Sequence, residues 1–213
     1  AIQRYLDLPV LGYLPHDSTI SLPSRQLGLV PDDELPNVDK KIAKVAEDVK
    51  AHVNLQKLLS LATSVSEKVV DPFNIPKTRL RLGIAKDEAF NFYYADNIHL
   101  LEKTGIELIP FSPISDNYLP DVDALYFGGG YPEEFASQLA ANKSLKKEVY
   151  EFSQASKPIY AECGGLMYLG KALKQGENEF SMVGIFDGIS EMTPRLKKFG
   201  YCEAYPQVDC LLG

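Results

Sequence analysis

The stretch Pro158-Ile-Tyr-Ala-Glu-Cys-Gly-Gly-Leu-Met-Tyr168 places a cysteine between a short apolar run and two glycines. The run from Pro158 to Ala161 predicts a strand, and the residues from Leu166 to about Leu173 predict a helix. A tight strand-to-helix turn needs small neighbours, and it pushes the intervening side chain out of the sheet. The helix N-terminus favours a thiolate and carries N–H groups without intrahelical partners. Cys163 is therefore a candidate nucleophile with the N–H of Gly164 as an oxyanion donor, although a cysteine can also be a small buried hydrophobe.

A second glycine-rich turn, Phe127-Gly-Gly-Gly-Tyr-Pro-Glu133, follows a predicted strand at 124–127. A predicted helix over 133–155, broken near Asn142, comes after it. Successive glycines let the backbone approach a ligand and direct N–H groups toward it. The turn fits neither a Walker loop nor the dinucleotide fingerprint. It is either a source of a second oxyanion donor or a flexible connection between a strand and a helix.

Strands and helices alternate along this part of the chain, which predicts an α/β fold with a parallel sheet and right-handed crossovers. A strand over 80–85, a helix over 94–103 that ends at Gly105, and a strand over 106–111 precede the motifs above. Ligands of such sheets bind beyond the carboxyl ends of the strands. The loops that leave those ends are expected to carry the site; they are 86–93, 128–133 and 162–165.

The first part of the chain has a different pattern. Residues 9–14 predict a buried strand, 16–36 a loop, and 38–53 an amphipathic helix with Asn37 or Asp39 as its cap. A second helix is predicted over 54–62. These patterns indicate one region at 1–70, a proline-containing linker at 71–79, and a domain at 80–213 that we expect to be truncated at its C-terminus.

The composition excludes some classes of function. The chain of 213 residues carries a net charge of −7, which argues against a nucleic-acid-binding protein. No apolar run approaches the roughly 18 residues of a membrane span. The three cysteines fit neither a zinc site nor a disulfide framework, so Cys202 and Cys210 are incidental and a cytoplasmic protein with reduced thiols is expected.

Several strings together carry a family resemblance. Ala161-Glu-Cys-Gly-Gly-Leu-Met-Tyr168 and Gly128-Gly-Gly-Tyr-Pro-Glu133 resemble the cobyrinic acid a,c-diamide synthase family, as part of the wider cobyrinic and cobyric acid synthases. The further strings are Asp87-Glu-Ala-Phe-Asn-Phe-Tyr-Tyr94, Phe111-Ser-Pro-Ile-Ser-Asp116, Ser181-Met-Val-Gly184, Leu11-Gly-Tyr-Leu-Pro15 and Leu22-Pro-Ser-Arg-Gln-Leu-Gly-Leu29. The resemblance covers nearly the whole chain, and the motifs keep their order.

The resemblance implies a fragment of a two-domain enzyme that amidates the a and c carboxylates of cobyrinic acid with ammonia from glutamine. Residues 80–213 would form a class I glutamine amidotransferase-like, flavodoxin-like domain with helices on both faces of the sheet. Residues 1–70 would be a remnant of a P-loop synthetase domain. ATP and Mg²⁺ would bind the N-terminal domain of the full-length enzyme, and this chain alone would bind neither.

The resemblance also implies roles for individual residues. Cys163 would be the nucleophile, and Gly129 or Gly130 would provide oxyanion donors together with Gly164. The glutamine pocket would draw on the residues Gly128, Tyr131, Glu133 and Tyr93. No metal ligand is implied within this chain.

The sequence departs from the family pattern in three ways. It contains no P-loop, and Gln26 stands where the family has histidine. The three histidines, His16, His52 and His99, all precede Cys163, whereas the catalytic histidine of the family follows the nucleophile. A thiol nucleophile normally needs a base. We therefore expect the isolated chain not to hydrolyse glutamine at an appreciable rate.

Three alternatives stay open at this stage. The chain is also compatible with a cobyric acid synthase or another glutamine-dependent ligase, which would share the elbow. A non-catalytic α/β binding module would carry Cys163 as a vestige. A cysteine hydrolase or redox-stress protein on a similar fold is disfavoured by the synthetase-like strings upstream.

Overall fold

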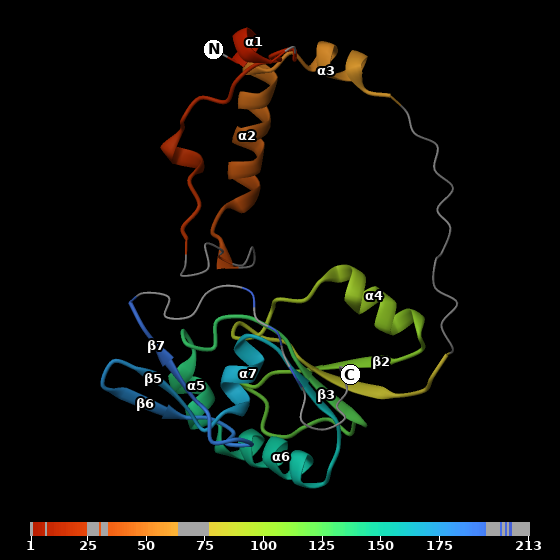
Figure 1. The fold of residues 1–213 in the computed structure, drawn as a ribbon, viewed down its shortest axis with the longest axis vertical. Helices are drawn as coiled ribbons and strands as arrows, with labels where there is room; N and C mark the ends of the chain where they lie inside the picture. Colours follow the sequence, from red (N-terminus) through yellow and green to blue (C-terminus); the bar gives the residue numbers. More distant parts are fainter. Residues whose placement is uncertain are drawn as a thin grey trace. The chain divides into compact units, whose positions relative to one another are not determined.

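The computed structural model divides the chain into two compact units, Ala1–Phe73 (unit 1) and Asn74–Gly213 (unit 2) (Figure 1). It describes residues 2–6, 8–24, 30, 34–63, 77–194, 201, 203 and 205. Gln26, Cys202, Cys210 and all of the predicted linker except 77–79 lie outside these ranges. The assignment of residues 1–70 to a synthetase domain stays a prediction.

Unit 1 consists of short helices. Its elements are α1 (Ile2–Tyr5), η1 (Ser18–Ile20), α2 (Val38–His52) and α3 (Leu55–Leu61). Asn37 occupies the N-cap position of α2 without a side-chain hydrogen bond, whereas the side chain of Asn54 caps α3 by accepting from the N–H of Lys57. The strand predicted at 9–14 is wrong. The only pairing there among the described residues is an isolated bridge between Gly12 and Val53, because no neighbouring strand completes a ladder.

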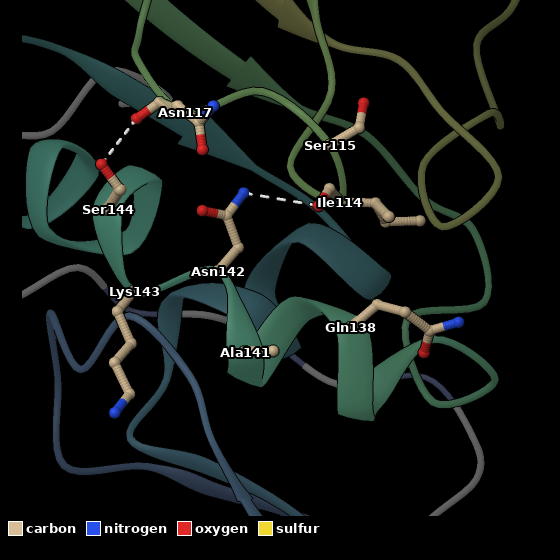
Figure 2. A pocket seen from close by; sticks show the side chains of 8 residues that line it. All are labelled: Ile114, Ser115, Asn117, Gln138, Ala141, Asn142, Lys143 and Ser144. Carbon is tan, nitrogen blue, oxygen red and sulfur yellow. Dashed lines mark hydrogen bonds between the residues drawn. The ribbon is translucent and has the colours of Figure 1, made fainter.

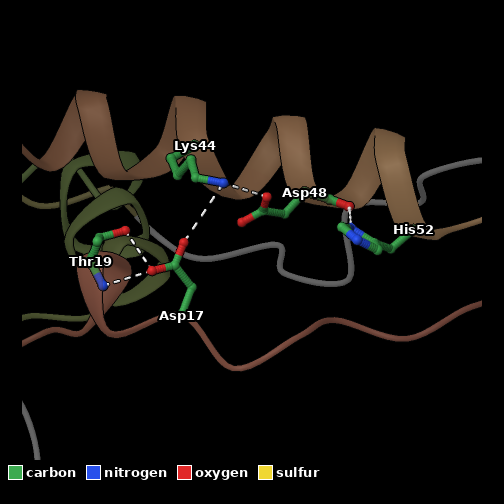
Figure 3. Close-up of polar contacts among 5 residues, drawn as sticks. All are labelled: Asp17, Thr19, Lys44, Asp48 and His52. Carbon is green, nitrogen blue, oxygen red and sulfur yellow. Dashed lines mark hydrogen bonds and ion pairs between the residues drawn. The ribbon is translucent and has the colours of Figure 1, made fainter.

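Polar contacts tie the segment around η1 to α2. The ammonium of Lys44 lies 2.5 Å from the Asp48 carboxylate and 3.7 Å from that of Asp17, and Asp17 accepts from the N–H of Thr19 (Figure 3). His52 bonds the Asp48 carbonyl at 2.9 Å. Contacts of this exposed kind contribute little to stability.

Unit 2 contains the predicted parallel sheet. Four strands, β1 (Arg81–Ala85), β2 (Glu107–Phe111), β3 (Ala124–Phe127) and β4 (Ile159–Ala161), pair in the order β2-β1-β3-β4, and every pairing is parallel. The β1-to-β2 connection and the β3-to-β4 connection step in opposite directions along the sheet. Right-handed crossovers therefore place α4 (Ala95–Lys103) on one face and α5 (Ala136–Ala141) with α6 (Lys143–Gln154) on the other.

Asparagine and glycine account for two helix boundaries that the sequence predicted. Asn142 separates α5 from α6, because its side chain accepts from the N–H of Leu145 and so caps α6. Gly105, at φ 87°, follows the end of α4. The core lies between the sheet and the helices α5, α6 and α7 (Gly164–Leu169); its largest fully buried side chains include those of Phe90, Leu125, Phe127, Leu139, Leu145, Val149 and Tyr168.

A second, mixed sheet follows α7. Strands β5 (Ala172–Gln175), β6 (Asn178–Ser181) and β7 (Ile189–Met192) pair in the order β6-β5-β7. The predicted continuation of the helix to Leu173 is wrong, because the chain turns extended at Gly170 and enters β5. Buried Lys146 of α6 binds this sheet by donating from Nζ to the carbonyl of Ser181 in β6 at 2.7 Å, and it also donates to the carbonyl of Ala140 in α5 at 2.8 Å.

Candidate active site

Cys163 stands on a sharp bend between β4 and α7. It is the N-cap residue of α7, with φ 49° and ψ −114°, and its side chain is exposed. Such backbone angles cost a non-glycine residue about 1–3 kcal/mol and persist only where the surroundings impose them. Backbone hydrogen bonds on both sides impose them here, from Glu162 N–H to Phe127 O (3.1 Å) and from Gly165 N–H to Glu162 O (2.9 Å). The structure thus has the elbow that the sequence predicted.

The two glycines after Cys163 permit close packing of the elbow. A Cβ on Gly165 would lie 2.4 Å from the carbonyl oxygen of Phe127. A Cβ on Gly164 would lie 2.8 Å from Cδ of Pro132. Any side chain at these positions would therefore push α7 away from the end of β3.

The glycine turn after β3 lies directly against the elbow. A Cβ on Gly129 would be 3.5 Å from Cβ of Cys163, and a Cβ on Gly164 would be 3.2 Å from the backbone nitrogen of Gly130. No backbone hydrogen bond within the described ranges uses the N–H of Gly130 or Gly164 as its donor, whereas Gly129 is paired with Phe92 in an isolated antiparallel bridge. The structure therefore brings the three glycines predicted as oxyanion donors together beside the thiol, and it leaves the N–H groups of Gly130 and Gly164 available to a ligand.

The loop after β1 closes a third side. The N–H groups of Asn91 and Phe92 donate to the carbonyl of Gly129 at 3.2 and 3.1 Å. The Tyr93 hydroxyl accepts from the N–H of Gly128 at 3.0 Å and donates to the carbonyl of Ala85. Burial raises the pKa of Tyr93, so this phenol stays protonated as a donor at neutral pH. All three loops predicted to carry the site meet at one edge of the sheet.

The other predicted pocket residues differ in how they reach the site. Tyr131 is only 1% exposed and packs edge-on against Phe92, with ring centroids 5.2 Å apart. Gly128 is buried under the Tyr93 ring. Glu133 is half-buried, and its carbonyl accepts from the Gln175 side chain at 2.7 Å. Tyr131, Gly128 and Tyr93 therefore pack beneath the loops of the site.

Sequence reasoning missed Asp87, which joins the loops after β1 and β2. One carboxylate oxygen accepts from the N–H groups of Ala89 (2.9 Å) and Phe90 (3.1 Å), and the other from the hydroxyl of Ser112 (2.8 Å) and the N–H of Ile114 (2.9 Å). Burial raises the pKa of this carboxyl, and the hydrogen bonds oppose that effect. The available signal was a carboxylate two residues after the end of a buried strand.

Sequence reasoning also missed the contacts of Glu162, the residue before Cys163. The Glu162 carboxylate accepts from the hydroxyl of Tyr126 at 2.6 Å and from that of Tyr160 at 3.4 Å. Burial, followed by the hydrogen bond to Glu162, raises the pKa of Tyr126. The available signal was that Glu162 directly follows β4, two positions after Tyr160, a spacing at which extended residues point to the same side.

A separate pocket of about 490 Å³ lies at the junction of α5 and α6 (Figure 2). Within it, the Asn142 amide donates to backbone carbonyls of the loop after β2, including that of Pro113 at 2.9 Å, and the Ser144 hydroxyl donates to the Asn117 carbonyl at 2.8 Å. Neither Cys163 nor any of the three glycine donors lines it; the lining residues are Ile114, Ser115, Asn117, Gln138, Ala141, Asn142, Lys143 and Ser144. The pocket is therefore a second feature of unit 2, outside the elbow.

The described residues hold no group of three or more His, Cys, Asp and Glu side chains able to bind a metal ion. None of the helices within those ranges combines the length and apolarity of a membrane span.

Unit 2 is thus an α/β domain whose parallel sheet carries an exposed cysteine on a strand-to-helix elbow at its carboxyl edge. Residues 81–209 match the family of CobB/CobQ-like glutamine amidotransferase domains, and the chain belongs to this family.

Individual relatives are consistent with this family. The chain is 93% identical over 213 residues to a cobyrinate a,c-diamide synthase of Limosilactobacillus reuteri (strain DSM 20016), which covers all of the chain and 47% of that relative. It is 48% identical over 214 residues to the enzyme of the same name from Streptococcus sanguinis (strain SK36), again covering 47% of the relative. The chain thus spans about half the length of the curated relatives it matches.

A solved structure of a glutamine amidotransferase also resembles the chain. Its TM-score is 0.39 at 21% identity, and the match covers 52% of this chain and 55% of that one.

Proposed function

We propose that this chain supplies the glutaminase nucleophile, Cys163, for a glutamine-dependent and ATP-driven amidation of the a and c carboxylates of cobyrinic acid in cobalamin biosynthesis. The observation that carries the proposal is the exposed thiol on a strained elbow beside the N–H groups of Gly130 and Gly164, which have no hydrogen-bond partner within the described residues. The relatives named cobyrinate a,c-diamide synthase support the corrin substrate and disfavour the alternative of a cobyric acid synthase. A cytoplasmic location stays a prediction from cysteine usage.

The proposed chemistry follows the geometry of the elbow. Cys163 transfers its proton to a base, and its sulfur attacks the carboxamide carbon of glutamine, which moves the carbonyl electron pair to oxygen. The N–H groups of Gly129 or Gly130 and of Gly164 stabilise that oxyanion; loss of one such donor typically costs about 10²–10³ in rate. The oxyanion collapses, the nitrogen takes the proton from the base, and ammonia leaves. Water then hydrolyses the glutamyl thioester to glutamate and frees the thiol.

The chain offers no evident base to accept the proton of the Cys163 thiol. No histidine follows Cys163 in the sequence, and His99 is exposed on α4. The helix terminus contributes only about 0.3–1 kcal/mol toward the thiolate, which is too little to replace a base. We therefore propose that the isolated chain turns over glutamine very slowly and that a longer protein completes the site.

ATP and Mg²⁺ do not fit the residues at hand. The sequence has no P-loop, and the described residues hold no metal-binding cluster. We assign both to the N-terminal ATP-binding domain of a longer protein, of which residues 1–70 would be the last part, and we derive no step of the reaction through them.

Covalent labelling tests the nucleophile directly. A diazoketone analogue of glutamine should alkylate Cys163: the sulfur–carbon bond forms, dinitrogen leaves, and the thiol proton moves to the diazo carbon. We expect saturable labelling at Cys163, located by mass spectrometry of peptides, and none at that site in Cys163→Ala. Labelling no faster than at Cys202 would instead support the non-catalytic module.

A product assay tests the substrate. In a protein of the relatives' full length that carries this chain, cobyrinic acid, glutamine and ATP should yield a product in which two hydroxyls are replaced by amino groups. Cys163→Ala should abolish this reaction with glutamine and retain it with added ammonia. Amidation of a different corrin only would overturn the proposed substrate.

A further inference from the structure

Glu162 precedes the proposed nucleophile, and its side chain hydrogen-bonds a residue of another strand, Tyr126 of β3. Its carboxylate accepts the hydroxyl of Tyr126 at 2.6 Å, and the longer contact to the Tyr160 hydroxyl is 3.4 Å. Tyr126 of β3 and Tyr160 of β4 are register partners whose rings meet edge-on, 5.2 Å apart. A hydrogen bond to a charged acceptor is stronger than one between neutral groups. Glu162 therefore fastens the elbow to the strand that carries the glycine turn.

These contacts extend to the third loop of the site. The ring of Tyr93 meets the ring of Tyr126 edge-on with centroids 5.2 Å apart. The hydroxyl of Tyr93 in turn accepts from the N–H of Gly128 and donates to the carbonyl of Ala85. We call Tyr93, Tyr126, Tyr160 and Glu162 the tyrosine clamp; it joins the loops that leave β1, β3 and β4.

The clamp lies where the backbone most needs support. Cys163 has angles that are unfavourable for a side-chain-bearing residue, and a strained residue relaxes unless several contacts fix it. The backbone hydrogen bonds of Glu162 and Gly165 hold the main chain on both sides of Cys163. The hydrogen bond from Tyr126 to the Glu162 carboxylate holds the side chain of the residue just before Cys163. A nucleophile displaced by about 1 Å can lose about 10²-fold in rate.

We propose that Glu162 is a positioning residue: held by the Tyr126 hydroxyl, it keeps the Cys163 thiol aligned with the N–H groups of Gly129, Gly130 and Gly164. The inference rests on the proposed role of Cys163 as nucleophile and adds a residue that acts through it. Because the hydroxyl of Tyr126 needs only an acceptor, an amide oxygen at position 162 can replace the carboxylate. A purely charge-based role would not survive that replacement.

The test measures alkylation of Cys163 by the diazoketone glutamine analogue, followed by mass spectrometry, in the chain with Cys202 and Cys210 replaced by serine. Glu162→Ala should lower the maximal labelling rate by about 10²-fold while the half-saturating concentration changes by less than about threefold. Glu162→Gln should recover most of the maximal rate, and Tyr126→Phe should resemble Glu162→Ala. Glu177→Ala, in the exposed turn after β5, is the matched control and should behave like the parent.

Three outcomes overturn the inference. The first is a Glu162→Ala variant with the parent's maximal rate. The second is a loss that Glu162→Gln does not recover. The third is a loss that follows the unfolded fraction measured in the same samples by circular dichroism.

A second reagent separates this inference from the proposed function. Iodoacetamide alkylates a thiol without using a glutamine pocket, so it reports on Cys163 even if the analogue fails to bind. Glu162→Ala should slow alkylation of Cys163 and Glu162→Gln should restore it. Equal rates of iodoacetamide alkylation in the parent and both variants would reject Glu162 as a positioning residue. If the parent reacts with iodoacetamide but not with the glutamine analogue, the proposed glutaminase function is rejected.

Discussion

Units 1 and 2 have similar apolar side chains but bury them very differently. No described residue of unit 1 is buried, and its large apolar side chains include Ile42 at 61% and Leu59 at 72% exposure. An apolar groove of about 310 Å³ lies along α2, lined by Ile20, Leu22, Val38, Lys41, Ile42, Val45 and Ala46. Unit 2 packs a continuous core in which Phe90, Phe127 and Tyr168 meet edge-to-face or tilted.

The difference teaches what holds each unit together. Apolar burial is the main favourable term that offsets the conformational entropy lost on folding. Unit 2 has that term, whereas the described part of unit 1 relies on helix propensity and exposed polar contacts such as Lys44 with Asp48. A helix such as α2 is marginal without tertiary packing.

The strongest test of this contrast separates the units. Residues 74–213 expressed alone should unfold in urea with one cooperative transition, because the core lies within them. Residues 1–73 alone should show no cooperative transition, because they bury too little apolar surface. Far-ultraviolet circular dichroism against urea concentration measures both. A sharp transition for 1–73 would contradict our account of unit 1.

A matched pair of leucine deletions comes next in size. Leu139→Ala removes a fully buried side chain from the unit 2 core and should lower the free energy of unfolding by about 2–5 kcal/mol. Leu59→Ala removes an exposed side chain from unit 1 and should change it by less than about 0.5 kcal/mol. Urea titrations of the whole chain give both values. Equal losses would mean that Leu59 packs in solution.

A pair of carboxylate changes tests the polar contacts. Asp87→Asn leaves one carbonyl oxygen to serve four donors and should destabilise unit 2 by about 1–3 kcal/mol. It should also slow labelling of Cys163, since the loop after β1 packs on Gly129. Asp17→Asn, at an exposed contact in unit 1, should leave both readouts unchanged. Labelling at the parent rate in Asp87→Asn would show that the loops hold their positions without this carboxylate.

The smallest effect concerns a buried phenol. The hydroxyl of Tyr168 has no hydrogen-bond partner within the described residues, and burial raises its pKa. The fold therefore favours the protonated phenol, so this contribution to stability is present below pH about 10 and is lost as pH rises through the higher pKa of the folded state. Tyr168→Phe should stabilise unit 2 by up to about 1 kcal/mol at pH about 7 and by more above pH about 10.

Urea titrations at the two pH values measure the effect of Tyr168→Phe. Tyr13→Phe, at an exposed tyrosine of unit 1, is the control and should change neither value. A loss of stability in Tyr168→Phe would indicate that the hydroxyl has a partner in solution.

The sequence predicted the parts of unit 2 that depend on local chemistry. The elbow followed from a cysteine and two glycines, and the boundary between α5 and α6 from Asn142, because turns and caps need particular residue types. Strand β5 was missed because apolar residues stand on both sides of Gly170 and Lys171, and the predicted helix was continued through these two residues to Leu173. Helix α7 ends at Gly170, which has an extended backbone conformation. A Cβ at this position would lie 2.8 Å from the carbonyl oxygen of Gly188.

Long-range contacts were beyond the reach of sequence patterns. Asp87 and Ser112 lie 25 positions apart, and Tyr126 and Glu162 lie 36 apart. Neither pairing leaves a periodic signal, since each depends on the order of the strands in the sheet. The strand wrongly predicted at 9–14 fails for the same reason: an apolar run shows a preference for burial but does not provide a partner.

One lysine has a consequence for the mixed sheet. Lys146 projects from α6, and its ammonium ends between the carbonyls of Ala140 and Ser181, so the length of a single side chain sets the spacing between that helix and β6. Its Nζ also lies 3.2 Å from the Ser181 hydroxyl. A buried lysine thus links α6 to the mixed sheet. The oxygens that accept its hydrogen bonds are two backbone carbonyls and one hydroxyl, so none of these three partners carries a charge.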